Sequence, residues 1–236
     1  MAAGKSSVAG GEPTLHSPYA GDGAQLAYGL GPDGRLRHIS EVQGGKACDC
    51  VCPACRAPLV AKLPKEKITR HFAHLAETSC SGGPETAVHY LAKEVLDANK
   101  RLKVPSVEAS SGEFKEVAYV TREMAFYRAE IERRLDGVTP DIIVYHGDRE
   151  LLVEIYVTHR CGQEKIDRLK SMNLPALELD LSHLGRNATR EEVAQAVTTK
   201  APRKWLYNAK IDAAQRRADD KAAKAKLQKD RKLDEE

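Results

Sequence analysis

The chain has few aromatic residues and no long hydrophobic run. Phe, Trp and Tyr make up 5% of its 236 residues, so we expect no aromatic platform for stacking single-stranded nucleic acid. The longest apolar stretches, such as 151–157, are short and carry a charge, so no segment is expected to span a bilayer. Residues 1–15 lack the apolar core of a signal peptide, and we therefore expect a cytoplasmic protein.

The charge of the chain is nearly balanced but unevenly placed. The sequence has 37 Lys and Arg against 34 Asp and Glu, a net charge of +3. Residues 201–236 carry 11 basic and 7 acidic residues, a balance of +4 that leaves −1 for the rest. Affinity for nucleic acid therefore has to come from local basic patches.

Composition and periodicity divide the chain into four segments. Residues 1–24 are rich in Gly, Ser, Ala and Pro, which is typical of a disordered leader. Residues 25–82 contain short strand patterns around a cysteine cluster and predict a small β module. Residues 83–200 mix helix and strand patterns, and 201–236 predict a long charged helix.

Two patterns within 83–200 are the clearest. After Pro84, apolar residues recur with helical spacing from Val88 to Leu96, which predicts a helix. Strand patterns at 151–157 and 176–181 flank a helical pattern at 163–172. That order predicts a right-handed crossover between two parallel strands.

The spacing of cysteine and histidine indicates a metal site in the β module. Cys52 and Cys55 form a Cys-x-x-Cys pair, and His71 and His74 follow as His-x-x-His. Two thiolates and two imidazoles complete the tetrahedral sphere of a structural Zn²⁺ ion. Cys80 could replace His71, so the prediction is that four of these five residues bind zinc.

Other interpretations of the cysteine cluster stay open. Cys48 and Cys50 are surplus to a four-ligand site and could act as alternate ligands. A redox Cys-x-x-Cys would instead begin a helix in a βαβ unit, whereas the flanks here are rich in Pro and Lys. Because all groups of a closed site are present, we expect a structural metal ion.

Two carboxylates are expected to oppose one another across a hairpin. Gly147-Asp148 is a natural tight turn between two alternating segments. Asp141 and Glu154 lie equally far from its centre, hence directly opposed on one face. Opposed like charges destabilise a strand pair unless a cation neutralises them. Mg²⁺ or Mn²⁺ would do so, because such ions bind one or two carboxylates together with phosphate oxygens. Such an ion can activate water against a phosphodiester; the alternative is that both acids face solvent.

The helix after Pro84 carries three further polar groups on one edge. Glu85, His89 and Lys93 are spaced by four residues. An acid, an imidazole and an amine placed in this way could border a site for a metal ion and a phosphate. The same spacing is also common on a solvated helix face.

The ordered set of motifs resembles the CoiA-like competence proteins, which are PD-(D/E)xK nucleases. The matching pieces span about 25–181 and are Cys52–Cys55, His71–His74, Glu85–His89 with Ala92-Lys93, Pro140-Asp141 and Val153–His159. The resemblance implies an α/β fold, with a restriction-endonuclease-like αβββαβ core behind an N-terminal zinc module. It also implies that Asp141 and Glu154 bind the catalytic metal ion, that Glu85 is an auxiliary acid, and that His89 and Lys93 flank the site.

The chain departs from the family motif at Tyr156, where the family has a lysine. Lys165 is the candidate replacement because it opens the helix after the Glu154 strand, and His89 is the second choice. Thr158 shares the strand face of Glu154 by alternation, and His159 follows at the strand end.

The sequence therefore predicts a Mg²⁺-dependent nuclease that hydrolyses phosphodiester bonds of DNA. One alternative is a DNA-binding protein of the same fold that has lost catalysis, which Tyr156 favours. Another is a zinc-stapled adaptor whose charged C-terminal helix binds a protein. The opposed acids favour the enzyme, because an adaptor has no need of their repulsion.

The C-terminal helix could contact DNA phosphates or remain solvated.

Overall fold

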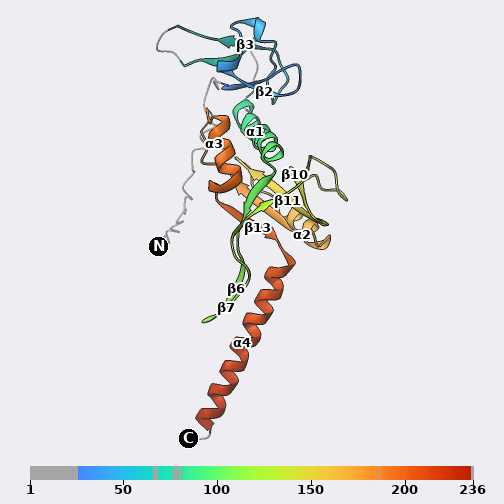
Figure 1. The fold of residues 1–236 in the computed structure, drawn as a ribbon, viewed down its shortest axis with the longest axis vertical. Coiled ribbons are helices and arrows are strands. Elements are labelled where there is room, and N and C mark those ends of the chain that lie inside the picture. The colour runs from blue at the N-terminus through green and yellow to red at the C-terminus, as the bar shows by residue number, and fades with distance from the viewer. Residues whose placement is uncertain (1–25, 66–68, 77–79, 81, 186, 235–236) are drawn as a thin grey trace, which may run out of the picture.

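The computed structural model describes residues 26–65, 69–76, 80, 82–185 and 187–234. The described chain is elongated, with the cysteine-rich module at one end, an α/β core in the middle and a long helix at the other end (Figure 1). The predicted leader at 1–24 lies outside the described residues. Within the described part, no helix is both long and apolar enough to cross a membrane.

The N-terminal module consists of two antiparallel strand pairs, as its short strand patterns predict. These are β1 (Tyr28–Leu30) with β2 (Leu36–His38), and β3 (Leu59–Lys62) with β4 (His71–His74). Two short 3₁₀ helices connect them, η1 (Ile39–Glu41) and η2 (Lys46–Cys48). Phe72 is fully buried at the centre of the module, and its backbone exchanges hydrogen bonds with Leu26.

The core is built on a five-stranded sheet in the order β13-β12-β11-β10-β9. The strands are β9 (Arg128–Ile131), β10 (Ile142–His146), β11 (Arg149–Tyr156), β12 (Ala176–Asp180) and β13 (Arg203–Tyr207). β9, β10 and β11 are antiparallel neighbours, and β12 runs parallel to β11, as the predicted crossover requires. β13 pairs antiparallel with the far edge of β12.

Helical segments cover both faces of the sheet. They are α1 (Gly83–Asn99), α2 (Gln163–Ser171), α3 (Arg190–Gln195) and the π-helical turn η3 (Ala196–Lys200). α1, α3 and η3 share a buried apolar cluster with one face, whereas α2 packs on the other (Figure 1). Sheets covered on both faces have nearly continuous apolar strands, which explains the fully buried run Ile142–Tyr145.

The hairpin β10–β11 has the register predicted from its turn. Ile142 pairs with Val153 and His146 with Arg149, which leaves Gly147-Asp148 as the turn. Gly147 has φ of +56°, a conformation that glycine adopts without strain. Continued by one residue, this register places Asp141 opposite Glu154.

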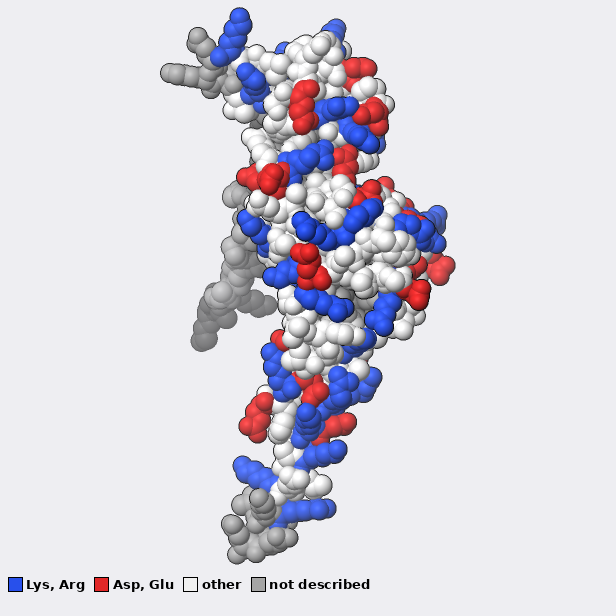
Figure 2. Space-filling model, viewed as in Figure 1, with Lys and Arg blue, Asp and Glu red and all other residues white. Residues whose placement is uncertain are grey.

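An extended ribbon leaves the core and lies along the C-terminal helix. β5 (Arg101–Val104) pairs with β8 (Arg122–Ala125), and β6 (Val107–Ser111) with β7 (Phe114–Tyr119). The outer pair lies beside α4 (Ala209–Asp234) (Figure 1). Ala214 and Ala218 of α4 are fully buried, and both charge signs are interspersed along the rest of the helix (Figure 2).

The charged helix begins later than predicted. Residues 203–207, assigned from the sequence to the helical tail, form β13 and complete the core sheet. Trp205 explains the difference, because its indole Nε1 donates to the carbonyl of Ser106 at 3.1 Å and its ring packs against the core. The core therefore extends to Tyr207, and only α4 is the charged helix.

Candidate functional site

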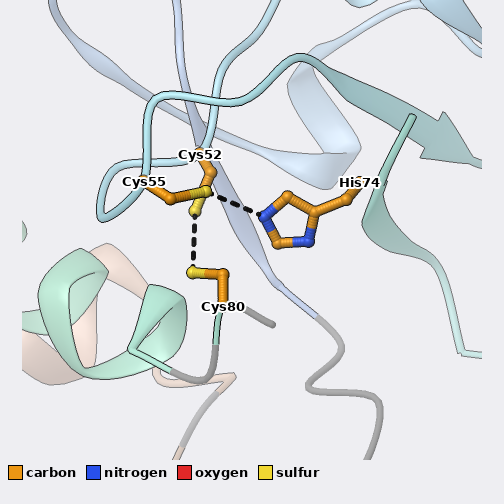
Figure 3. A group of neighbouring side chains, drawn as sticks. All are labelled: Cys52, Cys55, His74 and Cys80. Atoms are coloured by element: carbon orange, nitrogen blue, oxygen red, sulfur yellow. Dashed lines mark hydrogen bonds between the residues drawn. The ribbon is translucent and has the colours of Figure 1, made fainter. Parts of the chain in front are cut away.

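Four of the predicted zinc ligands meet at one point in the N-terminal module. The ligand atoms of Cys52, Cys55, His74 and Cys80 all lie within 4.8 Å of one another (Figure 3). Cys52 Sγ is 3.8 Å from Cys80 Sγ, and Cys55 Sγ is 3.4 Å from His74 Nε2. Three thiolates and one imidazole are a usual donor set for structural zinc. The cluster could therefore hold a metal ion such as zinc.

His71 does not join this cluster. His71 and His74 are the ends of strand β4, and residues three apart on a strand point to opposite faces. The Nδ1 atom of His71 instead lies 2.9 Å from the carbonyl oxygen of Thr69. Cys80, from the segment that leads into α1, provides the fourth ligand atom in its place.

Cys48 and Cys50 are core residues of the module rather than alternate ligands. Both are buried in the apolar cluster around Phe72. Cys50 Sγ lies 3.1 Å from the carbonyl oxygen of Cys48, and burial raises the pKa of this thiol to about 12. A buried free cysteine packs as a small apolar group in a core, and the cluster of neighbouring ligand atoms contains Cys52, Cys55, His74 and Cys80 without Cys48 or Cys50.

A close backbone approach joins the cluster to the core. A Cβ atom on Gly83 would lie 2.5 Å from Leu26 Cδ2 and 3.4 Å from Cys52 Sγ. Only glycine fits there without a shift of its neighbours. Because Gly83 is the first residue of α1, the Cys/His cluster lies directly against the helix that borders the acidic residues.

Asp141 sits in a set of donors at the start of β10. Its Oδ2 accepts from the backbone N–H of Ile155 at 2.8 Å and lies 3.1 Å from His89 Nε2. Its Oδ1 lies 3.2 Å from Lys93 Nζ. Burial opposes ionisation, but His89, Lys93 and the Ile155 N–H outweigh it and lower the pKa of Asp141 to about 2. Asp141 is therefore a carboxylate at neutral pH.

Glu154 is buried with only one of its oxygens satisfied. Oε2 accepts from Lys165 Nζ at 2.7 Å, and the same ammonium donates to the carbonyl of Thr139 at 2.9 Å. Oε1 is buried and has no hydrogen-bond partner within the described residues. Burial raises the pKa of Glu154 to about 7, with Lys165 opposing and Asp141 adding to the rise. An unpaired buried oxygen of this kind is costly unless a ligand satisfies it.

These acids line a cavity of about 250 Å³ at the end of the sheet. His89, Asp141, Glu154, Tyr156, His159 and Lys165 all contribute to its wall. The structure thus brings together the predicted acid pair, the candidate lysine and the candidate histidine. The alternative of two acids facing solvent is not what the structure has, since Glu154 is 6% exposed.

The predicted auxiliary acid lies beside the cavity rather than in its wall. Glu85 accepts a hydrogen bond from the Thr158 hydroxyl, and its Oε1 lies 3.6 Å from His159 Nδ1. Lys93 is 3% exposed and pairs with Glu132 at 2.6 Å as well as with Asp141. Of the three helix residues, His89 and Lys93 contact Asp141, and Glu85 positions the end of β11.

Sequence reasoning missed two charged residues in the cavity wall, Arg160 and Glu178. Glu178 is 2% exposed and lies in parallel register with Glu154. Its Oε1 accepts from Arg160 Nη1 at 2.6 Å and lies 3.1 Å from Lys204 Nζ. The signal that could have found Glu178 is an acid between Leu177 and Leu179, in a strand whose first four positions are otherwise apolar.

The comparisons with known proteins add no identification. No family model, curated protein or solved structure matches the chain. The likeness to CoiA-like proteins accordingly stands on the ordered motifs alone, and the function has to be argued from the site.

Without a divalent cation at the acid pair, the free energy of unfolding should decrease as the pH rises, because of Glu154. An unfolded glutamate ionises near pKa 4.5, whereas burial raises the pKa of the folded Glu154 to about 7. The protonated Glu154 therefore contributes to the free energy of unfolding in full below pH 4.5, and this contribution is lost as the pH rises to 7. The loss amounts to roughly 2–3 kcal/mol. Asp141, with its pKa lowered to about 2, contributes stability that stays constant over this range.

Urea unfolding at pH 5 and at pH 8 measures this effect. These values lie about two pH units below and one above the folded-state pKa of Glu154. The single tryptophan, Trp205, reports on the core sheet. Glu154→Gln removes the titration, so the wild type should become less stable relative to the variant at the higher pH. An equal difference between the two proteins at both pH values would contradict the assignment.

Proposed function

We propose that the protein is a metal-dependent nuclease that hydrolyses phosphodiester bonds of DNA. The observation that carries the proposal is the opposed pair Asp141 and Glu154, which lines the cavity with Asp141 partly exposed, Glu154 buried and Lys165 paired with Glu154. The motif order of CoiA-like and other PD-(D/E)xK nucleases supports it. The order of the core elements also supports it: α1, then β9-β10-β11, α2 and β12, with the ribbon β5–β8 inserted after α1.

The acid pair fits a hard divalent cation such as Mg²⁺ or Mn²⁺. Both candidate ligands are carboxylates, the donors that these ions prefer. Glu154 Oε1 is buried without a partner in the described chain, and a cation beside it would satisfy that oxygen. When bound, the ion supplies Lewis-acid activation of water and of the phosphodiester.

The protein's own side chains would position and neutralise the reacting groups. Lys165 lies on the Glu154 carboxylate, so its ammonium is placed to stabilise negative charge on a phosphate. Lys165 would thus replace the motif lysine that Tyr156 displaces. His89 Nε2 lies 3.1 Å from Asp141 Oδ2 and helps to hold that carboxylate in place.

The cysteine-rich module would have a structural role in this protein. We propose that Cys52, Cys55, His74 and Cys80 hold a structural Zn²⁺ ion, because their ligand atoms lie within 4.8 Å of one another and four such donors complete the coordination of structural zinc. The ion would fix the module against the start of α1, whose next turns carry His89 and Lys93.

Plasmid cleavage tests the proposed activity. The purified protein is incubated with supercoiled DNA in Mg²⁺, in Mn²⁺ and in EDTA, alongside Glu154→Ala. Nicking or linearisation that requires metal and disappears in the variant supports the nuclease. A shifted but uncut plasmid with both proteins supports instead the DNA-binding protein that has lost catalysis, for which Tyr156 at the motif position is the favouring observation.

Lys165→Ala should lower the cleavage rate by about 100-fold, the scale of a positioned charge or proton-transfer group. The variant removes the ammonium at 2.7 Å from Glu154. Lys170→Ala is the matched control, because Lys170 is exposed on the same helix and does not line the cavity. Equal rates for the two variants would exclude Lys165 as the replacement for the motif lysine.

A further inference from the structure

We propose that Arg160 binds a backbone phosphate of the nucleic-acid substrate next to the acid pair, and that Tyr156 is the platform for its guanidinium. The inference rests on the proposed function for the identity of the substrate. It concerns a binding subsite, however, and not the cleavage step.

The guanidinium of Arg160 is held on two sides. Its Cζ lies 4.0 Å from the centre of the Tyr156 ring, a distance at which a cation is attracted to an aromatic face. Nη1 donates to Glu178 at 2.6 Å and Nη2 to Asp180 at 3.2 Å. A guanidinium has five N–H donors, so these contacts fix the plane and leave donors for a ligand.

The position of Arg160 suits a phosphate beside the metal pair. Arg160 lines the same cavity as Asp141 and Glu154, and its side chain is 50% exposed. Glu178, which holds it, lies one strand away from Glu154 in parallel register, a separation of about 4.8 Å. The free edge of the guanidinium therefore lies beside, and not on, the acid pair.

The buried Glu178 holds two of the protein's own cationic side chains, Arg160 and Lys204. A carboxylate that is 2% exposed is costly unless it is paired. Arg160 and Lys204 both contact its Oε1, and Lys204 lies directly opposite Glu178 on β13. Glu178 thus acts as a positioning residue that holds the half-exposed guanidinium of Arg160 in the cavity wall and also pairs with Lys204 on the neighbouring strand.

The subsite also explains the tyrosine at the motif position. A lysine at 156 would put a second positive charge against the Arg160 guanidinium and remove the ring beneath it. The ring, not the hydroxyl, makes the contact: the Arg160 guanidinium lies over the ring, and within the described residues the hydroxyl has no hydrogen-bond partner. Phenylalanine should therefore replace Tyr156 without loss.

Fluorescence anisotropy with a fluorescein-labelled DNA duplex tests the subsite. The zinc-loaded full chain is used without added Mg²⁺, so that binding is measured in the absence of cleavage. Arg160→Ala should weaken binding about 10-fold, as expected for one charge-assisted hydrogen-bond pair. The slope of log K against log salt should fall by about 0.9, the change for one lost phosphate contact.

Conservative variants separate binding from a merely structural role. Arg160→Lys should recover part of the affinity and the full salt slope, because it keeps the charge but not the planar fork. Tyr156→Phe should bind like the wild type, whereas Tyr156→Ala should resemble Arg160→Ala. Arg101→Ala is the control, since Arg101 is 58% exposed on β5 and lies outside the cavity.

The outcomes separate this subsite from the proposed nuclease. Unchanged affinity and salt slope in Arg160→Ala would overturn the subsite even if the protein cuts DNA. The same holds if Tyr156→Phe weakens binding as much as Tyr156→Ala, or if the wild type does not bind DNA. Binding that depends on Arg160 in a protein that cuts nothing would support the subsite and remove only the proposed activity.

Discussion

Serine in place of Cys52 should leave the purified protein without zinc, whereas the wild type should carry one zinc ion. The ligands come from three separate segments, the Cys52–Cys55 turn, the end of β4 and the approach to α1. Zinc in such sites contributes about 10–16 kcal/mol of apparent binding free energy, which is folding free energy for the segments it joins. Loss of the ion should therefore unfold the N-terminal module.

Metal analysis and hydrogen exchange check this result together. In Cys52→Ser, backbone amides of β3 and β4 should lose protection while those of β10 and β11 keep it, because the core has its own apolar clusters. His71→Ala is the matched control and should keep its zinc, since His71 lies outside the cluster. Zinc retained by Cys52→Ser, or lost from His71→Ala, would contradict the assigned ligand set.

Removal of either acid should lower metal-dependent DNA cleavage by about 100- to 1000-fold, the scale reached when a group that stabilises the transition state is deleted. Asp141→Asn and Glu154→Gln keep the shape of each side chain and remove its charge. Glu154→Gln should fold well, because the neutral amide suits a site that already favours the protonated acid. Asp141→Asn leaves Lys93 without one of its two carboxylate partners and should be the less stable variant.

Glu150→Gln is the control for the cleavage measurement. Glu150 lies on β11 four residues before Glu154, on the same face of the strand by alternation, and does not line the cavity. Its cleavage rate should equal that of the wild type. A Glu154→Gln protein that cuts plasmid at the wild-type rate would remove the acid pair from the mechanism.

The hairpin with its opposed acids could be predicted because its register is encoded locally. A two-residue turn and the alternation of both flanks fix which residues face one another, and the structure has that register. The pairing of Glu154 with Glu178 in the parallel register of β11 and β12 could not be predicted in the same way. Parallel strands are joined by a helical crossover, and the crossover length does not fix their register.

Two further details depend on tertiary packing: which of the five candidate zinc ligands stays outside the cluster, and where the charged helix begins. His-x-x-His spacing brings both rings together on a turn or a helix, but β4 is a strand and turns His71 away. Residues 203–207 adjoin the charged tail in sequence, yet Trp205 packs on the core and draws this segment into the sheet. In both cases tertiary packing decides the conformation, and spacing or composition alone does not carry that information.

Binding of Mn²⁺ to the zinc-loaded protein at pH 8 tests most directly whether Asp141 and Glu154 form a metal site. Electron paramagnetic resonance counts the bound ions in the wild type and in a protein with both Asp141→Asn and Glu154→Gln. We expect one Mn²⁺ ion per wild-type chain and none at this site in the double variant. Equal binding by both proteins, or no binding by the wild type, would contradict a metal site at the acid pair.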